Sequence, residues 1–398
     1  MRVALLTREY PPEIYGGAGV HVEYLSEHLS RLIDLDVFCF GRPRESPLVK
    51  AAFEPWEAIG SDRPHDAALK TLSVDLLMAA GVEGADVVHT HTWYANFAGH
   101  LARLLYDIPH VVTTHSLEPL RPWKAEQLGG GYAVSSFCER TALEAADAVI
   151  AVSGAMRDDI LETYPAIDPE RVVVIHNGVD TEEFTPDPAT DALPELGIDP
   201  DRPYVTFVGR ITRQKGIDLL LSAAERFDPD TQLVLLPSAP DTPEVGAEMR
   251  AGADALAEQR HGVLWLEQVL PRPELIQVLS HSAAAVCPSV YEPFGLVNVE
   301  AMACATAVVA TDVGGIPEIV VDGETGTLVH LELGADGQPA DPDRFIADLA
   351  AAVNGLVADP STAERMGALG RKRAVAEFSW PAIAQRTVEL YRSLTGSP

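Results

Sequence analysis

Short apolar segments rich in β-branched residues alternate with helix-period segments along almost the whole chain. In the first helix-period segment, 18–32, apolar residues recur every three or four positions. The short segments are nearly continuous in apolar residues, as is typical of parallel strands buried on both faces. The pattern therefore predicts an α/β fold. The predicted strands span 2–7, 36–40, 86–91, 110–115, 148–153 and 171–176, and then 204–209, 232–236, 263–266, 284–287, 307–311 and 326–329.

One break interrupts this alternation. Residues 185–203 contain five prolines and little periodicity, which indicates a linker between domains. A chain of 398 residues is long enough for two or three domains. We therefore expect an N-terminal domain over 1–185, a linker over 186–203 and a C-terminal domain over 204–379. Three helical patterns end the chain, at 342–357, 361–377 and 381–394.

The charge of the chain limits its partners. The formal net charge is −30, so general binding to nucleic acid or to an anionic membrane is not expected. No segment reaches the roughly 18 consecutive apolar residues of a membrane span, and the start is too short for a secretory signal. We expect a cytoplasmic protein. The four cysteines form no C-x-x-C pair and are interpreted as buried thiols.

A basic pair follows the first strand of the second half. In the segment 208–216, Arg210 and Lys215 lie in a turn that leads into a helix at Gly216. A planar guanidinium and a compact ammonium can converge on the oxygens of a diphosphate. A charged surface turn is the structural alternative, but ligands of open α/β sheets bind beyond the carboxyl ends of strands. We therefore predict an anion site here.

Two acidic residues, Glu292 and Glu300, lie eight positions apart after the strand 284–287. Pro293 and Gly295 argue against one continuous helix, so we place Glu292 in a loop and begin a helix near Gly295. The backbone N–H groups of 295–297 would then face a phosphate, and Glu300 could accept hydrogen bonds from ribose hydroxyls. The Gly-Gly-x-Pro turn at 314–317 suits either a close approach to a ligand or a plain turn.

The first half has weaker candidates. Gly16 and Gly17 lie after the first strand and could bring backbone N–H groups to an anion, and His115 ends a strand, although such a histidine is more often structural. The polar loop 116–132 contains Arg121 and Lys124, and loops of this length are commonly functional or mobile.

His89 and His91 face the same side of one strand and could be a ligand pair. We find no third ligand at a suitable spacing and expect no metal and no other cofactor.

Taken together, these residues resemble the GT-B glycosyltransferases of glycosyltransferase family four. The resemblance covers essentially the whole chain. It rests on the Gly-Gly loop, the strand ending at His115, the Asn-Gly-Val-Asp of 177–180, the G-R-x-x-x-x-K-G of 209–216, the E-x7-E pair, the Gly-Gly-x-Pro-Glu turn and the Phe-Ser-Trp of 378–380. It implies two Rossmann-like domains facing an interdomain cleft, with the last helix, 380–398, crossing back to complete the N-terminal domain.

The resemblance also implies a retaining transfer in which the leaving diphosphate departs from the face that the acceptor attacks. Arg210 and Lys215 would hold the diphosphate, Glu292 the sugar hydroxyls and Glu300 the ribose, while His115 would lie against the oxocarbenium-like ring. The implied catalytic residues are thus His115, Glu292, Arg210 and Lys215, and the further donor contacts come from Gly16, Gly17, Gly295, Leu296, Val297 and Glu300.

Within the family, residues 7–21 and 118–124 look like actinobacterial enzymes of α-glucan synthesis. The expected reaction moves glucose from ADP-glucose, or UDP-glucose, to glucose-1-phosphate and gives α-maltose-1-phosphate. Elongation of a glucan chain, as in a glycogen synthase, is the alternative, but the related starch and glycogen synthases carry Lys where this chain has Tyr15. More distant alternatives are a membrane mannosyltransferase, a nucleotide-sugar epimerase and a non-catalytic glucan-binding protein. The expected acceptor contacts are Tyr15, His21, Arg121 and Lys124, and a homodimer is plausible.

Overall fold

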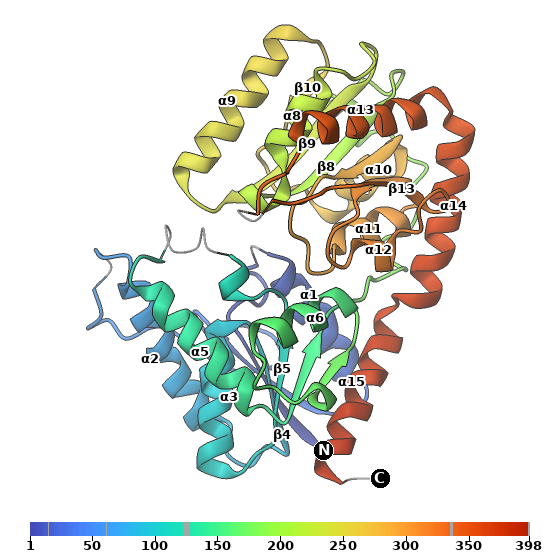
Figure 1. Ribbon diagram of the computed structural model, residues 1–398. Coiled ribbons are helices and arrows are strands. Elements are labelled where there is room, and N and C mark those ends of the chain that lie inside the picture. Colours follow the sequence, from blue (N-terminus) through green and yellow to red (C-terminus); the bar gives the residue numbers. More distant parts are fainter. Residues whose placement is uncertain (15, 61, 122–127, 335–336, 397–398) are drawn as a thin grey trace. The chain divides into compact units, whose positions relative to one another are not determined.

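The computed structural model describes residues 1–14, 16–60, 62–121, 128–334 and 337–396. The chain divides into two compact units (Figure 1). The first unit comprises Met1–Gly178 together with Trp380–Pro398, and the second comprises Val179–Ser379.

The first unit is built on a seven-stranded sheet in the order β3-β2-β1-β4-β5-β6-β7. Every neighbouring pair is parallel. The central strands are buried on both faces, which explains their nearly continuous apolar sequence. The strands are β1 (Arg2–Thr7), β2 (Asp34–Phe40), β3 (Val49–Phe53), β4 (Val87–His91), β5 (His110–Thr114), β6 (Ala148–Ala151) and β7 (Val172–Val174).

Helices cover both faces of this sheet (Figure 1). They are α1 (Gly17–Leu29), α2 (Asp66–Gly81), α3 (Trp93–Tyr106), α5 (Gly131–Ala145), α6 (Gly154–Thr163) and α15 (Trp380–Thr395), with short 3-10 turns η1 (Glu118–Leu120) and η2 (Pro169–Arg171). On one face, the last helix, α15, buries Ile383, Val388 and Tyr391 in the same core as Val22 and Leu25 of α1. This confirms that the final helix crosses back to the N-terminal domain.

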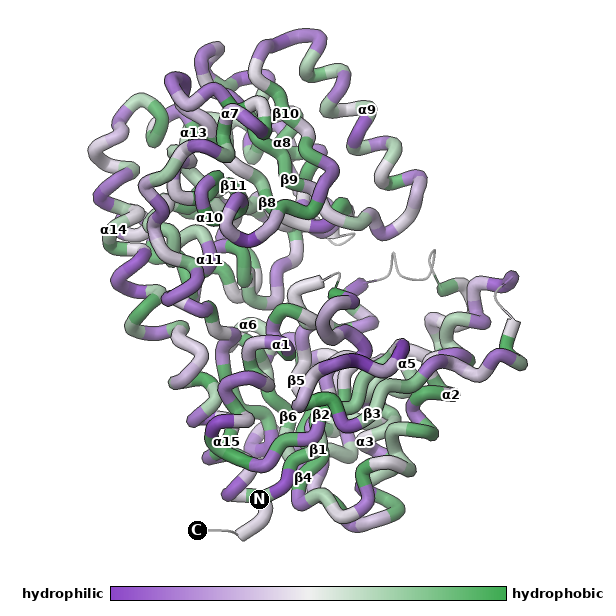
Figure 2. The backbone as a smooth tube through the Cα atoms, turned by 180° about the vertical axis from the view of Figure 1, so that it is seen from behind, coloured by the Kyte–Doolittle hydropathy of each residue, from purple (hydrophilic) through white to green (hydrophobic). Residues whose placement is uncertain are grey.

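The second unit repeats the design with six parallel strands in the order β10-β9-β8-β11-β12-β13. In Figure 2 its strands are mainly hydrophobic, whereas the outer helix α9 mixes hydrophobic and hydrophilic positions. The elements are β8 (Tyr204–Ile211), β9 (Gln232–Pro240), β10 (Val263–Trp265), β11 (Ala284–Cys287), β12 (Val308–Thr311), β13 (Gly326–Val329), η3 (Arg213–Lys215), α7 (Ala192–Glu195), α8 (Ile217–Ala224), α9 (Pro243–Gln259), α10 (Arg272–His281), α11 (Leu296–Ala303), α12 (Ile316–Ile319), α13 (Pro342–Ala358) and α14 (Pro360–Glu377).

Both sheets reverse their strand order at one point, between β1 and β4 in the first unit and between β8 and β11 in the second. Ligands of doubly wound sheets bind beyond the carboxyl ends of the strands at such a switch point. Each unit therefore has one favoured place for a site. The predicted pair of Rossmann-like domains is confirmed.

Two expectations about the chain differ from the structure. Strand β3 is absent from the sequence prediction because it is a half-buried edge strand that contains Lys50 and lacks an apolar run. The expected N-terminal domain ends at 185, whereas the structural division falls after Gly178. The proposed linker, 186–203, packs within the second unit, where Leu193 and Ile198 are buried beside Val278. Its prolines break the periodicity without preventing this packing.

Candidate active site

Lys215 occupies the switch point of the second unit, at the end of the turn that follows β8. Gly216, the next residue, has a left-handed φ of 61°, and a Cβ there would lie 2.1 Å from the carbonyl oxygen of Pro288. Only glycine permits this close approach. The turn therefore packs directly against the loop after β11 and brings Lys215 to Glu292.

The ammonium of Lys215 donates a hydrogen bond to Oε2 of Glu292 at 2.5 Å, and Ser289 Oγ donates to the same oxygen at 3.1 Å. Burial disfavours the lysine charge, but the Glu292 carboxylate outweighs burial and raises the pKa of Lys215. The lysine therefore remains a cation. A partly buried cation already held at this position can neutralise an incoming phosphate.

The loop that carries Glu292 is fixed by the glycine turn of 314–315. Gly314 has a φ of 56°, and a Cβ there would lie 2.0 Å from the carbonyl oxygen of Glu292. The N–H of Gly315 donates to that oxygen at 2.9 Å. The glycine turn was expected to suit either a close approach to a ligand or a plain turn. In the structure, its backbone closely approaches the carbonyl oxygen of Glu292. Its physical effect is to set the position of the acidic side chain.

Arg210, at the end of β8, is the second cation of this site. Its guanidinium donates a hydrogen bond to Oδ1 of Asp241 at 2.7 Å. Its positive charge opposes the effect of Glu292 on the pKa of Lys215. Asp241 follows β9, the neighbour of β8 in the sheet. The structure therefore brings together Arg210, Lys215 and Glu292, as predicted, and adds Asp241, which was not among the predicted site residues. Its position after a strand is visible in the sequence, but the pairing of that strand with β8 is not.

Helix α11 begins at Leu296 with Gly295 as its cap, so the predicted helix start near Gly295 is confirmed. Leu296 and Val297 lie in its first turn, and the backbone N–H groups at a helix start can bind an anion. Glu300 lies one turn further and is buried. Burial raises its pKa to about 8, against the opposing charge of Arg272. A carboxyl group with this pKa can both donate and accept hydrogen bonds at neutral pH.

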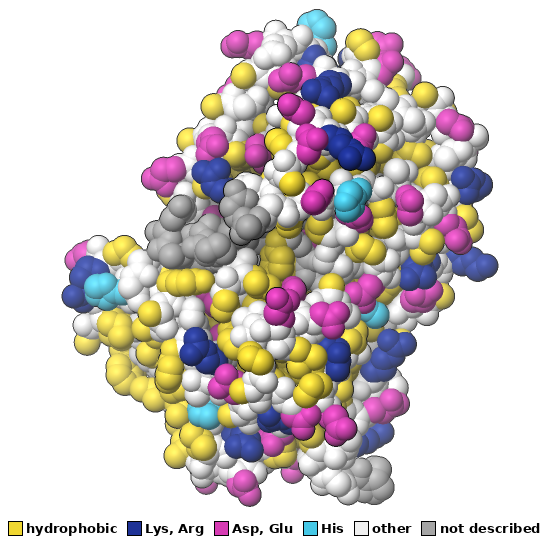
Figure 3. Space-filling model, viewed as in Figure 1, with side chains coloured by type: hydrophobic (Ala, Val, Ile, Leu, Met, Phe, Trp, Pro, Cys, Tyr) yellow, Lys and Arg dark blue, Asp and Glu magenta, His cyan; other side chains and the backbone are white. Residues whose placement is uncertain are grey.

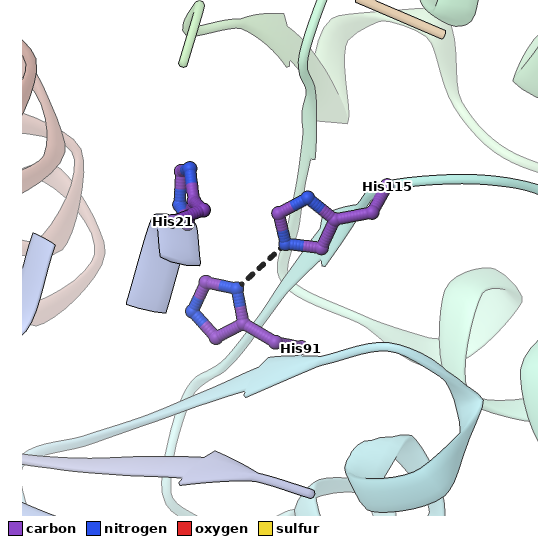
Figure 4. A group of neighbouring side chains, drawn as sticks. All are labelled: His21, His91 and His115. Atoms are coloured by element: carbon purple, nitrogen blue, oxygen red, sulfur yellow. Dashed lines mark hydrogen bonds between the residues drawn. The ribbon is translucent and has the colours of Figure 1, made fainter. Parts of the chain in front are cut away.

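At the switch point of the first unit, three histidine rings meet. His91 ends β4, His115 follows β5 and His21 comes from α1 (Figure 4). Nδ1 of His91 lies 3.0 Å from Nε2 of His115. The ring of His21 lies edge-on to that of His115, with 4.8 Å between ring centroids, and edge-on to that of Trp380 at 5.2 Å. Burial lowers the pKa of His115 to about 4, so this ring is neutral at pH 7.

The Gly-Gly loop leads into α1, with Gly16 as the cap and Gly17 as its first residue. The N–H of Gly16 donates to Oε2 of Glu9 at 2.9 Å. The predicted anion-binding N–H group therefore exists, but in this structure it binds a carboxylate of the chain itself. Glu9 was not among the predicted site residues.

A buried polar network lies at the start of the polar loop that carries Arg121, one of the expected acceptor contacts. The N–H of Glu118 donates to Oε1 of Glu139 at 2.9 Å, and the hydroxyl of Tyr164 donates to the same atom at 2.6 Å. Burial, reinforced by the charge of Glu118, raises the pKa of Glu139 to about 8. Arg121 donates to Ser116 Oγ at 3.0 Å. Two other expected acceptor contacts, Tyr15 and Lys124, lie outside the described residues.

His89 has a structural role. Its Nδ1 lies 2.6 Å from the hydroxyl of Tyr391 and its Nε2 lies 2.7 Å from Thr113 Oγ1. Both ring nitrogens of His89 therefore have hydrogen-bond partners, and His89 does not form a ligand pair with His91. His21 completes the histidine cluster instead. Sequence spacing does not show which helix residue packs against two given strand ends. The sequence therefore did not indicate that His21 lies beside His91 and His115.

Comparison with known proteins identifies the family. Residues 15–183 match Glycosyltransferase Family 4, and residues 189–373 match Glycosyl transferases group 1. The chain is 57% identical over 398 residues to the α-maltose-1-phosphate synthase of Mycolicibacterium smegmatis, covering 99% of this chain and 100% of that protein. The chain belongs to the family 4 glycosyltransferases. It is thus a transferase that depends on a sugar nucleotide.

Two further relatives of this glycosyltransferase are informative. It is 30% identical over 427 residues to the glycogen synthase of Mycobacterium tuberculosis, covering 98% of this chain and 94% of that protein. The structure of sucrose-phosphate synthase from Thermosynechococcus elongatus superposes with a TM-score of 0.79 at 28% identity, covering 100% of this chain and 99% of that one. The glycogen synthase is therefore a much more distant relative than the maltose-1-phosphate synthase.

The surface agrees with the charge analysis. On the face shown in Figure 3, acidic and basic side chains are intermixed among the described residues, without one basic patch. None of the helices in the described ranges combines the length and apolar composition that crossing a bilayer requires. All four cysteines are buried and none forms a disulfide, as expected.

Proposed function

We propose that this glycosyltransferase moves glucose from ADP-glucose to glucose-1-phosphate, with retention of the α configuration, to give α-maltose-1-phosphate. The observation that carries this proposal is the 57% identity, over the full length of both chains, to an α-maltose-1-phosphate synthase. The relation to a glycogen synthase is only 30% identity. A phosphorylated sugar, rather than a glucan, is therefore the favoured acceptor.

The donor diphosphate binds at Arg210 and Lys215 in this proposal. Both cations are already held at the switch point, one by Asp241 and the other by Glu292. Because the chain carries a net charge of −30, an anionic donor needs local cations of this kind. As the bond to glucose breaks, these two side chains and the start of α11 stabilise the negative charge that develops on the leaving diphosphate.

Glu292 binds the hydroxyls of the donor glucose in this scheme, because Lys215 and Ser289 fix its carboxylate through the same oxygen and leave the other oxygen for a ligand. His115 contacts the glucose ring, where positive charge develops in the transition state. A neutral ring is suited to this position, since a cation there would oppose that charge. Glu300 binds the ribose hydroxyls.

The proposed reaction requires no metal ion. Enzymes that bind phosphates through magnesium use the metal to neutralise oxygens, and here a guanidinium and an ammonium supply that charge.

The experiment that tests the function identifies the product. The protein is incubated with ADP-glucose plus glucose-1-phosphate, with ADP-glucose plus glycogen, and with ADP-glucose alone, and the products are analysed by mass spectrometry. A disaccharide phosphate in the first mixture only is the expected result. Growth of the glucan in the second mixture only would identify a glycogen synthase, and an isomer of the donor sugar in the third would identify an epimerase.

Two additional mixtures sharpen this experiment. Replacing ADP-glucose by UDP-glucose tests the donor, for which a lower kcat/KM is expected. The Lys215→Ala variant in the first mixture is a matched control for contaminating activity, because its product should fall in proportion to the loss at the donor site.

A further inference from the structure

The histidine cluster of the first unit, His21, His91 and His115, brings three potential metal ligands together. One ring nitrogen from each residue lies within 4.8 Å of the others. Figure 4 shows rings from three separate elements, α1, the end of β4 and the residue after β5, approaching a common region. Chain segments that are far apart in sequence thus supply one compact set of imidazole ligands.

This cluster has unused bonding capacity. Nε2 of His91 has no hydrogen-bond partner among the described residues, and the ring of His21 has only a side-chain interaction with Asn177 that falls outside standard hydrogen-bond geometry, although these atoms are buried. Buried polar atoms without partners are costly and call for an explanation. His89, which lies on the same face of β4, has partners for both of its nitrogens. Burial alone therefore does not account for the open nitrogens of the cluster.

The chemistry of imidazole suits ligation. A histidine binds a metal ion through one neutral ring nitrogen and keeps its single proton on the other. Each of the three rings can therefore present one nitrogen to a common ion.

We propose that His21, His91 and His115 form a binding site for a divalent transition-metal ion such as zinc, and that occupation of this site inhibits the enzyme. Zn²⁺ binds imidazole nitrogen at about 2.0–2.1 Å, so nitrogens of a tetrahedral set lie about 3.3 Å apart. The pair of His91 and His115, at 3.0 Å, is already close to that spacing. The wider separations, up to 4.8 Å, must shorten by about 1.5 Å when an ion binds.

The class of ion follows from the ligands. Imidazole suits zinc, copper, nickel and iron, whereas magnesium and calcium prefer oxygen ligands. Three histidines leave a fourth tetrahedral position for water or a substrate oxygen. The net charge of −30 also raises the local concentration of cations around the protein.

Inhibition follows from the position of His115, and this step rests on the proposed function. A bound ion would occupy the His115 nitrogen and place two positive charges beside the sugar ring. Positive charge also develops on that ring in the transition state, so the ion would raise the barrier to transfer. The binding of the ion itself does not depend on which sugar is transferred.

The test uses Co²⁺ as a spectroscopic probe and Zn²⁺ as the inhibitor. The wild-type protein is titrated with Co²⁺ and its visible absorption is recorded, because tetrahedral Co²⁺ absorbs far more strongly than the hydrated ion. The informative variant is His21→Phe, which removes both nitrogens but keeps a ring against Trp380. His330→Gln is the matched control, since His330 is an exposed histidine of the other unit. Thermal unfolding verifies that each variant is folded.

We expect one Co²⁺ per chain in the wild type and in His330→Gln, and affinity at least about 10-fold weaker in His21→Phe, since the loss of even an outer-shell contact costs this much. Zn²⁺, but not Mg²⁺, should inhibit the wild type, and a chelator should restore activity. Equal binding in His21→Phe and wild type, or no binding in either, would overturn the site. Binding without inhibition would overturn its inhibitory role. A protein that binds Co²⁺ but transfers glucose to no acceptor would refute the proposed function alone.

Discussion

Lys215 and Glu292, which lie 77 positions apart in the sequence, form a partly buried ion pair with 2.5 Å between Nζ and Oε2. Each follows one of the two strands that flank the switch point of the second sheet. The pair keeps a cation in place before any donor binds. In our proposal, this local cation allows an anionic donor to bind to a chain whose net charge is −30.

The position of Glu292 depends on Gly314. Gly314→Ala would place a Cβ at 2.0 Å from the carbonyl oxygen of Glu292, in addition to the strain of a left-handed φ. The loop must move, so we expect a loss of kcat/KM of about 10-fold or more, as when catalytic geometry shifts by about 1 Å. The measurement is steady-state kinetics with the donor varied.

Gly323→Ala is the matched control for that change. Gly323 also has a left-handed φ, 72°, but a methyl group added there would meet no atom of the described residues within 4 Å, apart from its own chain neighbours. It should lose about 1 kcal/mol of stability through backbone strain and retain activity. Equal kinetic effects of the two substitutions would show that strain, rather than displacement of Glu292, explains the result.

The buried carboxyl group of Glu139 should make stability depend on pH. Its pKa is about 8 in the folded chain against an ordinary value of 4.5. Because the unfolded chain releases this proton first, stability should fall as pH rises from about 4.5 through about 8 and level off above. Glu139→Gln removes this contribution, so its thermal midpoint should fall less between pH 5 and 8. Parallel profiles for the two proteins would contradict the assignment.

A buried hydrogen bond of 2.6 Å joins Tyr391 of α15 to His89 of β4. Tyr391→Phe leaves a histidine nitrogen without this partner and should reduce the free energy of unfolding by about 1–3 kcal/mol. Urea denaturation measures the change, with Tyr106→Phe, a half-buried tyrosine of the same unit, as the control. An unchanged midpoint for Tyr391→Phe would mean that this contact does not hold the helix.

Activity after treatment with a chelator tests whether the reaction requires a metal ion. Because Arg210 and Lys215 supply the positive charge for the diphosphate in our proposal, activity should be retained after treatment with a chelator. A strict dependence on added Mg²⁺ would contradict this mechanism.

Much of the fold follows from the sequence because buried parallel strands must be apolar along their whole length. β1, β11 and β13 have the predicted bounds. The half-buried edge strand β3 lacks that signal. The segment 186–203 has the proline content that is typical of a linker. Its few apolar side chains, among them Leu193 and Ile198, are nevertheless enough to pack it into the second unit.

The site shows the same limit. Arg210, Lys215 and Glu292 could be predicted because each follows a strand and has a recognisable motif. Asp241, Glu9 and the meeting of His21 with the other histidines could not, since their roles depend on which strands and helices become neighbours in space. Asp241 pairs with Arg210 across adjacent strands, and His21 meets His115 from a helix.

The most direct test of the account measures kcat/KM for ADP-glucose in Arg210→Ala and Lys215→Ala. A hydrogen bond to a charged group contributes about 1.5–3 kcal/mol, so each variant should fall by about 10- to 150-fold. Arg213→Ala, which removes an exposed cation of the same turn, paired at the surface with Glu248, is the matched control and should retain activity. Wild-type kcat/KM in both Arg210→Ala and Lys215→Ala would contradict the assignment of the donor site.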